Sequence, residues 1–156
     1  MAKRYWLVKS DPDTYGLADL EKERGKTTCW DGVRNYKARN HMRDEMKLGD
    51  GVLFYHSQAD PPAVVATAKV AREAHPDPTQ FDPKSRYHDP KATREEPRWF
   101  AVDIKLDRKL KRPVALPEMR ERPGLEGMEL LKRGSRHSVQ KVSAAEWKLV
   151  LKMGGL

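Results

Sequence analysis

Short runs in which apolar residues alternate with polar ones predict the strands in the first half of the chain. Residues 5–9, YWLVK, have the length and composition of a buried or edge strand. Residues 52–56, VLFYH, follow a Gly-Asp-Gly turn signal and are apolar on both faces, which favours a central strand. The alternation continues over residues 63–74, and we expect one face of this strand to carry Val64, Ala66, Ala68 and Val70.

Alternation returns in the second half after a long irregular segment. Residues 74–97 contain five prolines and no periodicity, which indicates a loop anchored by Phe81 and Tyr87. Residues 98–110 then predict a strand with one solvated face, and we expect Pro113 to end it. Its inward residues are expected to be Phe100, Val102, Ile104 and Leu106. A brief strand is also expected within residues 136–142.

Helical spacing is confined to short segments between these strands. Residues 16–26 have helical composition, and residues 33–46 predict a helix with a thin apolar stripe of Ala38, Met42 and Met46. Two short helical pieces are expected on either side of Pro123-Gly124. Ser143 and Glu146 form a capping-box pattern that opens a terminal helix. The chain therefore predicts one α+β domain, residues 1–156, with five or six short strands in a small mixed barrel or curled sheet.

Charge adds a possible class of partner. The net charge is +8, and most of the excess lies in residues 101–156, which hold 13 Lys and Arg against 7 Asp and Glu. Two basic clusters, at residues 105–112 and 132–141, could form one surface that attracts phosphates. A solvated basic face without a partner remains the alternative interpretation.

The cysteine count and the N-terminus bear on compartment. The single cysteine, Cys29, excludes an internal disulfide and every zinc site that needs a Cys pair. The apolar run at the N-terminus ends at Lys9, which is too short for a signal peptide or a membrane span. We expect a cytoplasmic protein, or a nuclear one in a eukaryote, with no membrane partner.

Sequence motifs for metal binding or catalysis are missing. The five histidines show no HxH, HxxxH or HExxH spacing, so no metal site is expected, and neither nucleophile elbows nor phosphate-binding glycine loops occur. One alternative stays open: Asp77 and Asp103 with Lys105 could hold a divalent ion in a nuclease or other hydrolase acting on nucleic acid. The stronger interpretation is that Asp103 and Lys105 are the solvated face of a strand.

The most unusual stretch is CWDGVRNYKARN, residues 29–40, which combines aromatic, amide and cationic side chains. Aromatic faces stack on nucleobases, and amides can pair with a base edge. Trp30 and Tyr36 could supply the faces, and Asn35 and Asn40 the edge contacts. The phosphate contacts could come from Arg34, Lys37 and Arg39. The rival interpretation makes Trp30 a core anchor, Asn35 a backbone cap and the cations a solvated helix face.

Several long motifs together resemble the EVE domain, which belongs to the same superfamily as PUA-like and YTH domains. They run in order from YWLVKSDPDTY through CWDGVRNYKARN, GDGVLFYHS, FDPKSRYHDP, PRWFAVDI and LKRPV to SVQKVSAAEW, which spans nearly the whole chain from Tyr5 to Leu151. The resemblance implies a PUA-like barrel with surrounding helices. It also implies a module that reads modified bases of DNA or RNA by accepting a flipped base in an aromatic-walled pocket.

Matched residue by residue, the resemblance implies a specific pocket. Its expected members are Lys9, Ser10, Trp30, Val33, Asn35, Tyr36, Phe54, His56, Ser57, Tyr87 and Ser138. Arg34, Arg39 and Arg136 are expected to contact phosphates. Trp30 and Tyr36 are expected to bracket the base, and the polar groups of Asn35, Ser10 and Ser57 to select it.

The sequence thus favours a non-catalytic nucleic-acid-binding module without a cofactor. Modified DNA or RNA is the expected partner, and a monomer is the expected state. Beside the hydrolase, the alternative of a small-molecule or protein-interaction module stays open. The identity of the base and the choice between DNA and RNA stay open as well.

Overall fold

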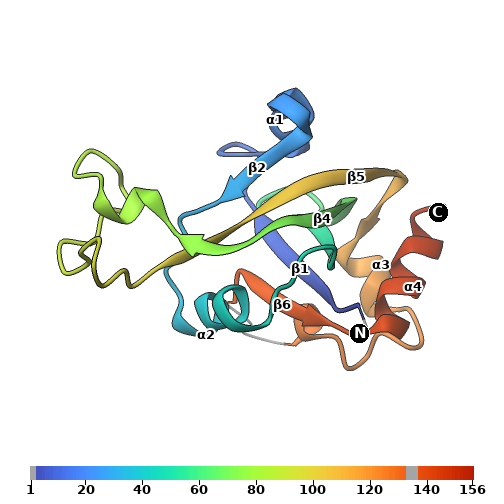
Figure 1. The fold of residues 1–156 in the computed structure, drawn as a ribbon. Helices are drawn as coiled ribbons and strands as arrows, with labels where there is room; N and C mark the ends of the chain where they lie inside the picture. The colour runs from blue at the N-terminus through green and yellow to red at the C-terminus, as the bar shows by residue number, and fades with distance from the viewer. Residues whose placement is uncertain (1–2, 133–136) are drawn as a thin grey trace.

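The computed structural model describes residues 3–132 and 137–156, and it builds them into one six-stranded mixed sheet with four α-helices around it (Figure 1). The strands are β1 (Tyr5–Ser10), β2 (Thr27–Trp30), β3 (Gly51–His56), β4 (Ala63–Pro76), β5 (Phe100–Ala115) and β6 (Val139–Val142). The α-helices are α1 (Leu17–Lys22), α2 (Tyr36–Asn40), α3 (Leu116–Arg120) and α4 (Ala144–Met153). Short 3-10 helices are η1 (Arg24–Lys26), η3 (Pro78–Phe81) and η4 (Glu129–Leu131), and η2 (His41–Glu45) is a π-helix.

The strand order across the sheet is β2-β5-β4-β3-β1-β6. Only β1 and β3 pair in parallel, and every other neighbouring pair is antiparallel. The central position predicted for residues 52–56 is confirmed, because β3 lies between β4 and β1 and all its residues except His56 are buried. The short strand β2 was not predicted, since its sequence TTCW is too short and too polar to show alternation.

The sheet curls around its main core. In the strand order β2 is separated from β3 by β5 and β4, so in a flat sheet the two strands would lie about 14 Å apart. The ring centroids of Trp30 on β2 and Phe54 on β3 are nevertheless only 5.6 Å apart. All six strands contribute to this core, and the N-terminal helical segments contribute Leu17, Leu20, Ala38, Met42 and Met46.

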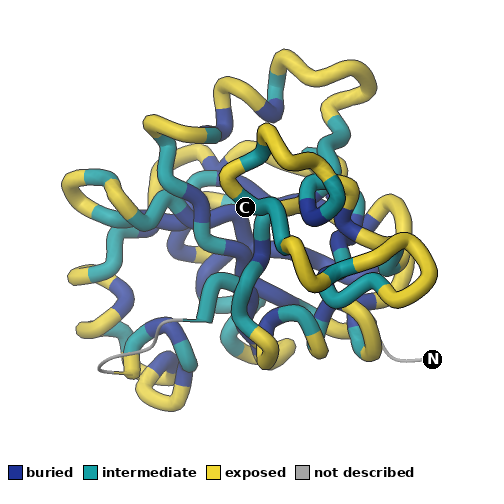
Figure 2. Tube along the Cα trace, turned by 90° about the vertical axis from the view of Figure 1, so that its left-hand side faces the viewer, coloured by how far each residue is buried: buried dark blue, intermediate teal, exposed yellow. Residues whose placement is uncertain are grey.

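A second core fills the opposite face of the sheet. Leu53 and Tyr55 of β3 pack there with residues of α3, α4 and the segment between α3 and β6. Figure 2 shows the buried segments gathered centrally and the exposed ones in the outer loops. The predicted capping box is present, since Ser143 Oγ accepts a hydrogen bond from Glu146 N and Glu146 Oε1 accepts one from Ser143 N.

Two predictions about the long strands are wrong. Val64 lies in the second core while Ala66, Ala68 and Val70 lie in the first, because the register shifts between Val64 and Ala66 and reverses the face. Pro113 does not end β5, which continues to Ala115. The proline falls between the registered pairs Ala66–Lys109 and Val64–Val114, where the ladder is irregular and a missing N–H is tolerated.

The predicted helix at residues 33–46 begins later than expected. Asn35 is extended and its side chain accepts a hydrogen bond from Ala38 N, so α2 starts at Tyr36. The stripe of Ala38, Met42 and Met46 is confirmed as buried. No helix in the described part of the chain has the length and apolar character needed to cross a membrane.

Candidate functional site

An open cavity of about 580 Å³ lies where β1 and β2 end. Its lining comes from four parts of the chain: the end of β1 with the turn before α1, the end of β2 with the turn after it, the loop before β5, and the residue directly before β6. The lining residues are Lys9, Ser10, Asp11, Thr14, Tyr15, Thr28, Cys29, Trp30, Asp31, Gly32, Val33, Arg86, Tyr87 and Ser138. The volume is typical of a small-molecule or cofactor site.

Trp30 belongs both to the cavity wall and to the main core. Its side chain is 9% exposed, and its ring meets the rings of Phe54 and Tyr15 edge-on, at centroid distances of 5.6 and 6.3 Å. Phe54 itself is fully buried. Phe54 therefore supports the wall from behind and does not line the cavity.

Tyr87 forms a second aromatic wall on top of Gly32. The backbone of Gly32 has a φ of +77°, and a Cβ on this residue would lie 2.7 Å from the tyrosine ring. Only glycine allows this contact, because other residues disfavour a positive φ and because any side chain would collide with the ring. The guanidinium of Arg86 lies 4.8 Å from the centroid of the Tyr87 ring and donates a 2.6 Å hydrogen bond to its hydroxyl.

A buried ion pair holds the Tyr87 loop against the segment after β2. Asp77 is fully buried, and its carboxylate accepts hydrogen bonds from Gly32 N at 2.8 Å, Arg34 Nη1 at 3.0 Å and Thr79 N at 2.8 Å. Burial acts most strongly and would raise the pKa of Asp77, but these hydrogen bonds together lower it below its usual value. Arg34 also donates to Tyr87 O at 2.6 Å. Arg34 thus acts as a clamp, and the structure does not support its predicted role as a phosphate contact.

Charged groups around the cavity are only partly hydrated. Burial lowers the pKa of Lys9, although Glu129 opposes this effect. Burial and the nearby negative charge of Asp77 raise the pKa of Asp31. Ser10 Oγ donates a hydrogen bond to Tyr15 O, which ties the end of β1 to the turn before α1. The lining therefore offers hydroxyl, carboxylate and ammonium groups beside the rings.

The structure brings six of the eleven expected pocket residues to this cavity: Lys9, Ser10, Trp30, Val33, Tyr87 and Ser138. It does not bring the other five there. Phe54 lies behind Trp30, and Ser57 lines a different groove together with Lys9 and Arg120. His56 Nε2 accepts a hydrogen bond from Leu17 N, so this ring holds the start of α1.

Asn35 and Tyr36 are the main departures from the expected pocket. The Asn35 side chain caps α2, as the rival interpretation of the sequence proposed. The helix begins at Tyr36, which does not line the cavity. Tyr36 is 49% exposed and stacks on Trp99 with a centroid distance of 4.9 Å. Tyr36 therefore does not line the cavity with Trp30, and Tyr87 is the other aromatic residue, besides Tyr15, that does.

The remaining predicted phosphate contacts lie apart from the cavity lining or outside the described residues. Arg39 packs its guanidinium 4.7 Å from the centroid of the Tyr36 ring and donates to Arg98 O. Arg136 lies outside the described residues. The cavity lining supplies Arg86 instead, which the sequence reasoning did not select.

Sequence reasoning missed eight lining residues: Asp11, Thr14, Tyr15, Thr28, Cys29, Asp31, Gly32 and Arg86. Six of them stand within the motifs SDPDTY and CWDG, next to residues that were selected. Proximity within those motifs was the available signal for these six. Arg86 carried the same kind of signal, since it stands directly before Tyr87 in the motif FDPKSRYHDP, whereas Thr28 gave none, because only strand pairing places it at the cavity.

The hydrolase alternative finds no support in the geometry. The Asp77–Asp103 pair that this alternative requires is not supported: Asp77 already accepts hydrogen bonds from Arg34, Gly32 and Thr79, and it does not belong to the ligand group that contains Asp103 among the described residues. Burial, followed by the negative charges of Asp31, Asp103 and Asp77, raises the pKa of the Cys29 thiol to about 12. Such a thiol stays protonated near neutral pH, so it is a poor nucleophile.

Comparison with known proteins identifies close relatives. Residues 4–153 match the family model of the EVE domain. Zebrafish (Danio rerio) thymocyte nuclear protein 1 is 39% identical over 165 residues, which cover 95% of this chain and 71% of the zebrafish protein.

Two solved structures show the same fold at high similarity. A hypothetical protein from Leishmania major has a TM-score of 0.92 and 44% identity, covering 99% of this chain and 96% of that protein. Human THYN1 protein, solved in complex with DNA that contains 5-methylcytosine, has a TM-score of 0.91 and 35% identity over 99% of both chains.

Proposed function

This chain belongs to the EVE-domain family and has its PUA-like α+β fold, and from that premise we propose that it is a nucleic-acid-binding module. Its cavity accepts one flipped, modified base and carries out no chemistry on it. The observation that carries this proposal is an open cavity walled by Trp30 and Tyr87, in a chain that superposes almost completely on a relative solved with 5-methylcytosine DNA.

The size and walls of the cavity suit a planar guest. Proteins that extrude a base from the stack hold it between aromatic or apolar side chains and read its polar edge. Trp30 and Tyr87 supply rings from β2 and from the loop before β5, and Arg86 beside Tyr87 supplies a positive charge for the sugar-phosphate backbone. Each stacked base is stabilised by about 1 to 3 kcal/mol.

Polar groups in the lining decide which base fits. Burying one methyl group contributes about 0.8 kcal/mol, which is roughly a fourfold preference, so the walls alone discriminate weakly. The sequence predicted Asn35, Ser10 and Ser57 as the selecting groups, but only Ser10 lines the cavity. We propose Thr28 and Asp31 in place of the other two, because a carboxylate can accept a hydrogen bond from the exocyclic amine of cytosine.

Absence of chemistry is supported by the state of two groups: Cys29, which lines the cavity, and Asp77, which holds the loop beside it. The Cys29 thiol has its pKa raised to about 12, and the Asp77 carboxylate is fully buried and already hydrogen bonded. Neither group is available for nucleophilic or general-base work on a bound base.

Tyr87 is a better test position than Trp30. Replacing a buried tryptophan by alanine costs about 3 to 5 kcal/mol of stability, and Trp30 is a core residue, so Trp30→Ala confounds folding with binding. Tyr87 is only partly buried and lies in a loop, which suits substitution.

The test compares Tyr87→Ala with the matched variant Tyr36→Ala, using fluorescence anisotropy on oligonucleotides that contain either 5-methylcytosine or cytosine. We expect Tyr87→Ala to weaken binding of the modified oligonucleotide by about tenfold, given ordinary stacking energies. Tyr36→Ala removes the same side chain outside the cavity and is expected to keep the ratio of the two affinities.

The opposite pattern would reject this cavity as the binding site. If Tyr36→Ala abolishes the preference for the modified base and a folded Tyr87→Ala protein keeps it, the base binds elsewhere. Repeating the measurement with RNA and with a panel of other modified bases identifies the cognate ligand.

A further inference from the structure

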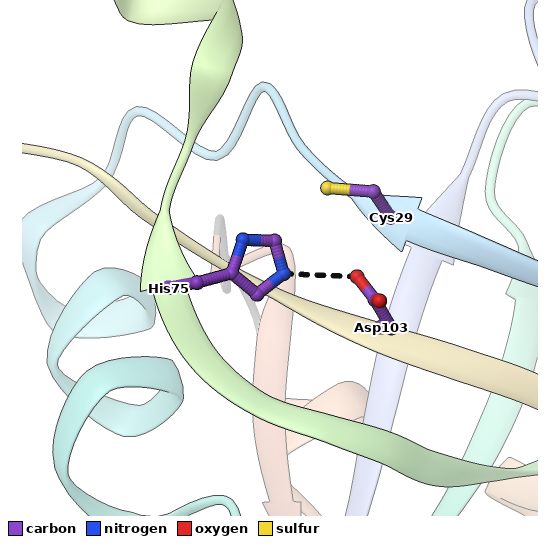
Figure 3. A group of neighbouring side chains, drawn as sticks. All are labelled: Cys29, His75 and Asp103. Carbon is purple, nitrogen blue, oxygen red and sulfur yellow. Dashed lines mark hydrogen bonds and ion pairs between the residues drawn. The ribbon is translucent and has the colours of Figure 1, made fainter.

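Three potential metal ligands from different strands lie close together on the sheet, although no sequence motif indicates a metal site. Cys29 comes from β2, His75 from β4 and Asp103 from β5, and one ligand atom of each lies within 4.8 Å of the others. Among the described residues, these three form the one group of at least three Cys, His, Asp or Glu side chains close enough to share a metal ion. Figure 3 shows the three side chains pointing into the same space, with the imidazole of His75 hydrogen bonded to Asp103.

Strand pairing holds these side chains in place. Cys29 and Asp103 are directly paired across β2 and β5. His75 pairs with Ala101 on the other side of β5, and its Nε2 lies 2.9 Å from Asp103 Oδ1. Because the ligands come from three paired strands and not from a mobile loop, little conformational freedom is lost when they bind an ion.

The separations are close to those of a tetrahedral zinc site. Metal–ligand distances of about 2.0 to 2.3 Å for oxygen, nitrogen and sulfur put the ligand atoms about 3.4 to 3.6 Å from one another. The three ligand atoms lie between 2.9 Å and 4.8 Å apart. Side-chain rotations that move these atoms by about 1 Å therefore bring them to the zinc geometry.

Partial burial and nearby charge also favour a cation. The side chains of His75 and Asp103 are 14% and 22% exposed, which leaves a route for an ion without full hydration of the ligands. Asp31 and Asp77 lie near enough to act on Cys29 electrostatically, and Arg72 opposes them with one positive charge. Together with Asp103 this makes three carboxylates against the one guanidinium of Arg72 around the Cys29 thiol.

We propose that Cys29 Sγ, His75 Nε2 and an oxygen of Asp103 bind one Zn²⁺ ion, with water completing the coordination. A thiolate, an imidazole and a carboxylate form a mixed ligand set that suits zinc better than calcium or magnesium, which prefer oxygen alone. The thiol proton passes to solvent as the Zn–S bond forms.

The ion links the edge strand β2 to β4 and β5. β2 pairs only with β5 and carries Trp30, the residue after Cys29. A zinc ion at this position therefore stabilises the strand that forms the cavity wall. This role does not depend on what the cavity binds.

The direct test is titration of the metal-free protein with Co²⁺, which replaces Zn²⁺ and reports its ligands by absorption. We expect one equivalent to bind and to produce a near-ultraviolet thiolate-to-cobalt charge-transfer band. Cys29 is the single cysteine of the chain, so the band can come from no other residue. Zn²⁺ is expected to displace the cobalt and to raise the melting temperature.

Substitutions of the ligands provide the second measurement. Cys29→Ser, His75→Gln and Asp103→Asn are each expected to weaken binding by at least about tenfold. His88→Gln replaces a histidine outside the cluster and is expected to bind like the unchanged protein. Circular dichroism confirms that each variant is folded.

Two results overturn the proposal. One is unchanged protein that binds no Co²⁺, or binds it without the charge-transfer band. The other is a folded His75→Gln or Asp103→Asn protein with unchanged affinity. Neither result bears on the base-binding proposal, since the oligonucleotide titrations are carried out without added metal.

Discussion

Gly32 is the residue on which the shape of the cavity most directly depends. Its positive φ turns the chain after β2, and its missing side chain lets the Tyr87 ring lie on the backbone. Its N–H also donates to Asp77, so one residue joins the end of β2 to the loop that carries Tyr87. The second aromatic wall exists because this position is a glycine.

Gly32→Ala is expected to displace the Tyr87 ring, since the added Cβ would lie 2.7 Å from it. The positive φ adds backbone strain of about 1 kcal/mol. We expect binding of a modified oligonucleotide to weaken about as much as in Tyr87→Ala, measured by anisotropy. Gly127→Ala, at a glycine with nothing within 4 Å of the added Cβ, is the matched control. Unchanged affinity in Gly32→Ala would show that the Tyr87 wall is not needed.

His56 makes stability depend on pH. Its Nε2 accepts a hydrogen bond from Leu17 N, and burial lowers its pKa in the folded state. As the pH falls below about 6.5, the unfolded chain therefore takes up a proton before the folded chain does. The stability is fully present above that pH and is lost as the pH falls towards the lower folded value.

His56→Gln is expected to remove this dependence, because the amide does not titrate. Urea unfolding at several pH values between 7.5 and 5.5 measures it. We expect the unfolding free energy of the unchanged protein to fall more steeply over this range than that of the variant. If the unfolding free energies of the two proteins fall in parallel as the pH is lowered, His56 is not the source of the pH dependence.

At the scale of elements, the segment between β4 and β5 behaves as a structured wall. Residues 77–99 project from the ends of the long β4 and β5 strands (Figure 1). Gln80 is fully buried and bridges the backbones of Asp77, Arg98 and Trp99. These internal hydrogen bonds explain how a proline-rich segment without regular periodicity is held in one conformation.

Asp77→Asn tests whether one ion pair holds this element. The change leaves Arg34 without its buried counter-charge, which is expected to cost about 3 kcal/mol in the free energy of unfolding. Urea unfolding measures the loss, and limited proteolysis locates it in the loop. Asp82→Asn, at an exposed position of the same loop, is expected to change stability by less than about 0.5 kcal/mol. Equal effects of the two changes would rule out the clamp.

At the scale of the whole molecule, the positive charge and the cavity are separate. The net charge is +8, but the cavity lining holds Lys9 and Arg86 against Asp11 and Asp31. Residues 133–136 of the second basic cluster lie outside the described residues, and β6, which carries the end of this cluster, is not a neighbour of β5 in the strand order. A single basic surface thus stays a prediction, and because the charges lining the cavity balance, general charge contributes little to the choice of base.

Salt dependence of binding follows from this distribution. We expect the logarithm of the association constant to fall with the logarithm of salt concentration with a slope of about −2 to −4, since only a few phosphates are contacted. Lys109→Gln with Lys111→Gln, on exposed positions of β5, is expected to leave the slope unchanged. A slope near zero would exclude phosphate contacts and favour a small-molecule or protein ligand.

The sequence by itself determined most of the strands, several helix features and the family. Alternation predicted β4 and β5, because the periodicity of apolar residues records which face of a strand is buried, while short apolar, β-rich runs predicted β1 and β3. The capping box of α4 and the stripe of Ala38, Met42 and Met46 were visible for the same local reason. Long motifs in a constant order were enough to indicate the EVE domain.

Only the tertiary structure decided which side chains meet. Asn35 caps α2 and Tyr36 stacks on Trp99 outside the cavity lining. The Asp77–Arg34 ion pair holds the distant loop that carries Tyr87 at the cavity that Trp30 also lines. Pairing of three strands likewise gathers Cys29, His75 and Asp103. The physical reason is that the direction of a side chain depends on backbone turns, sheet curl and strand register, and these are set by contacts between residues far apart in the chain.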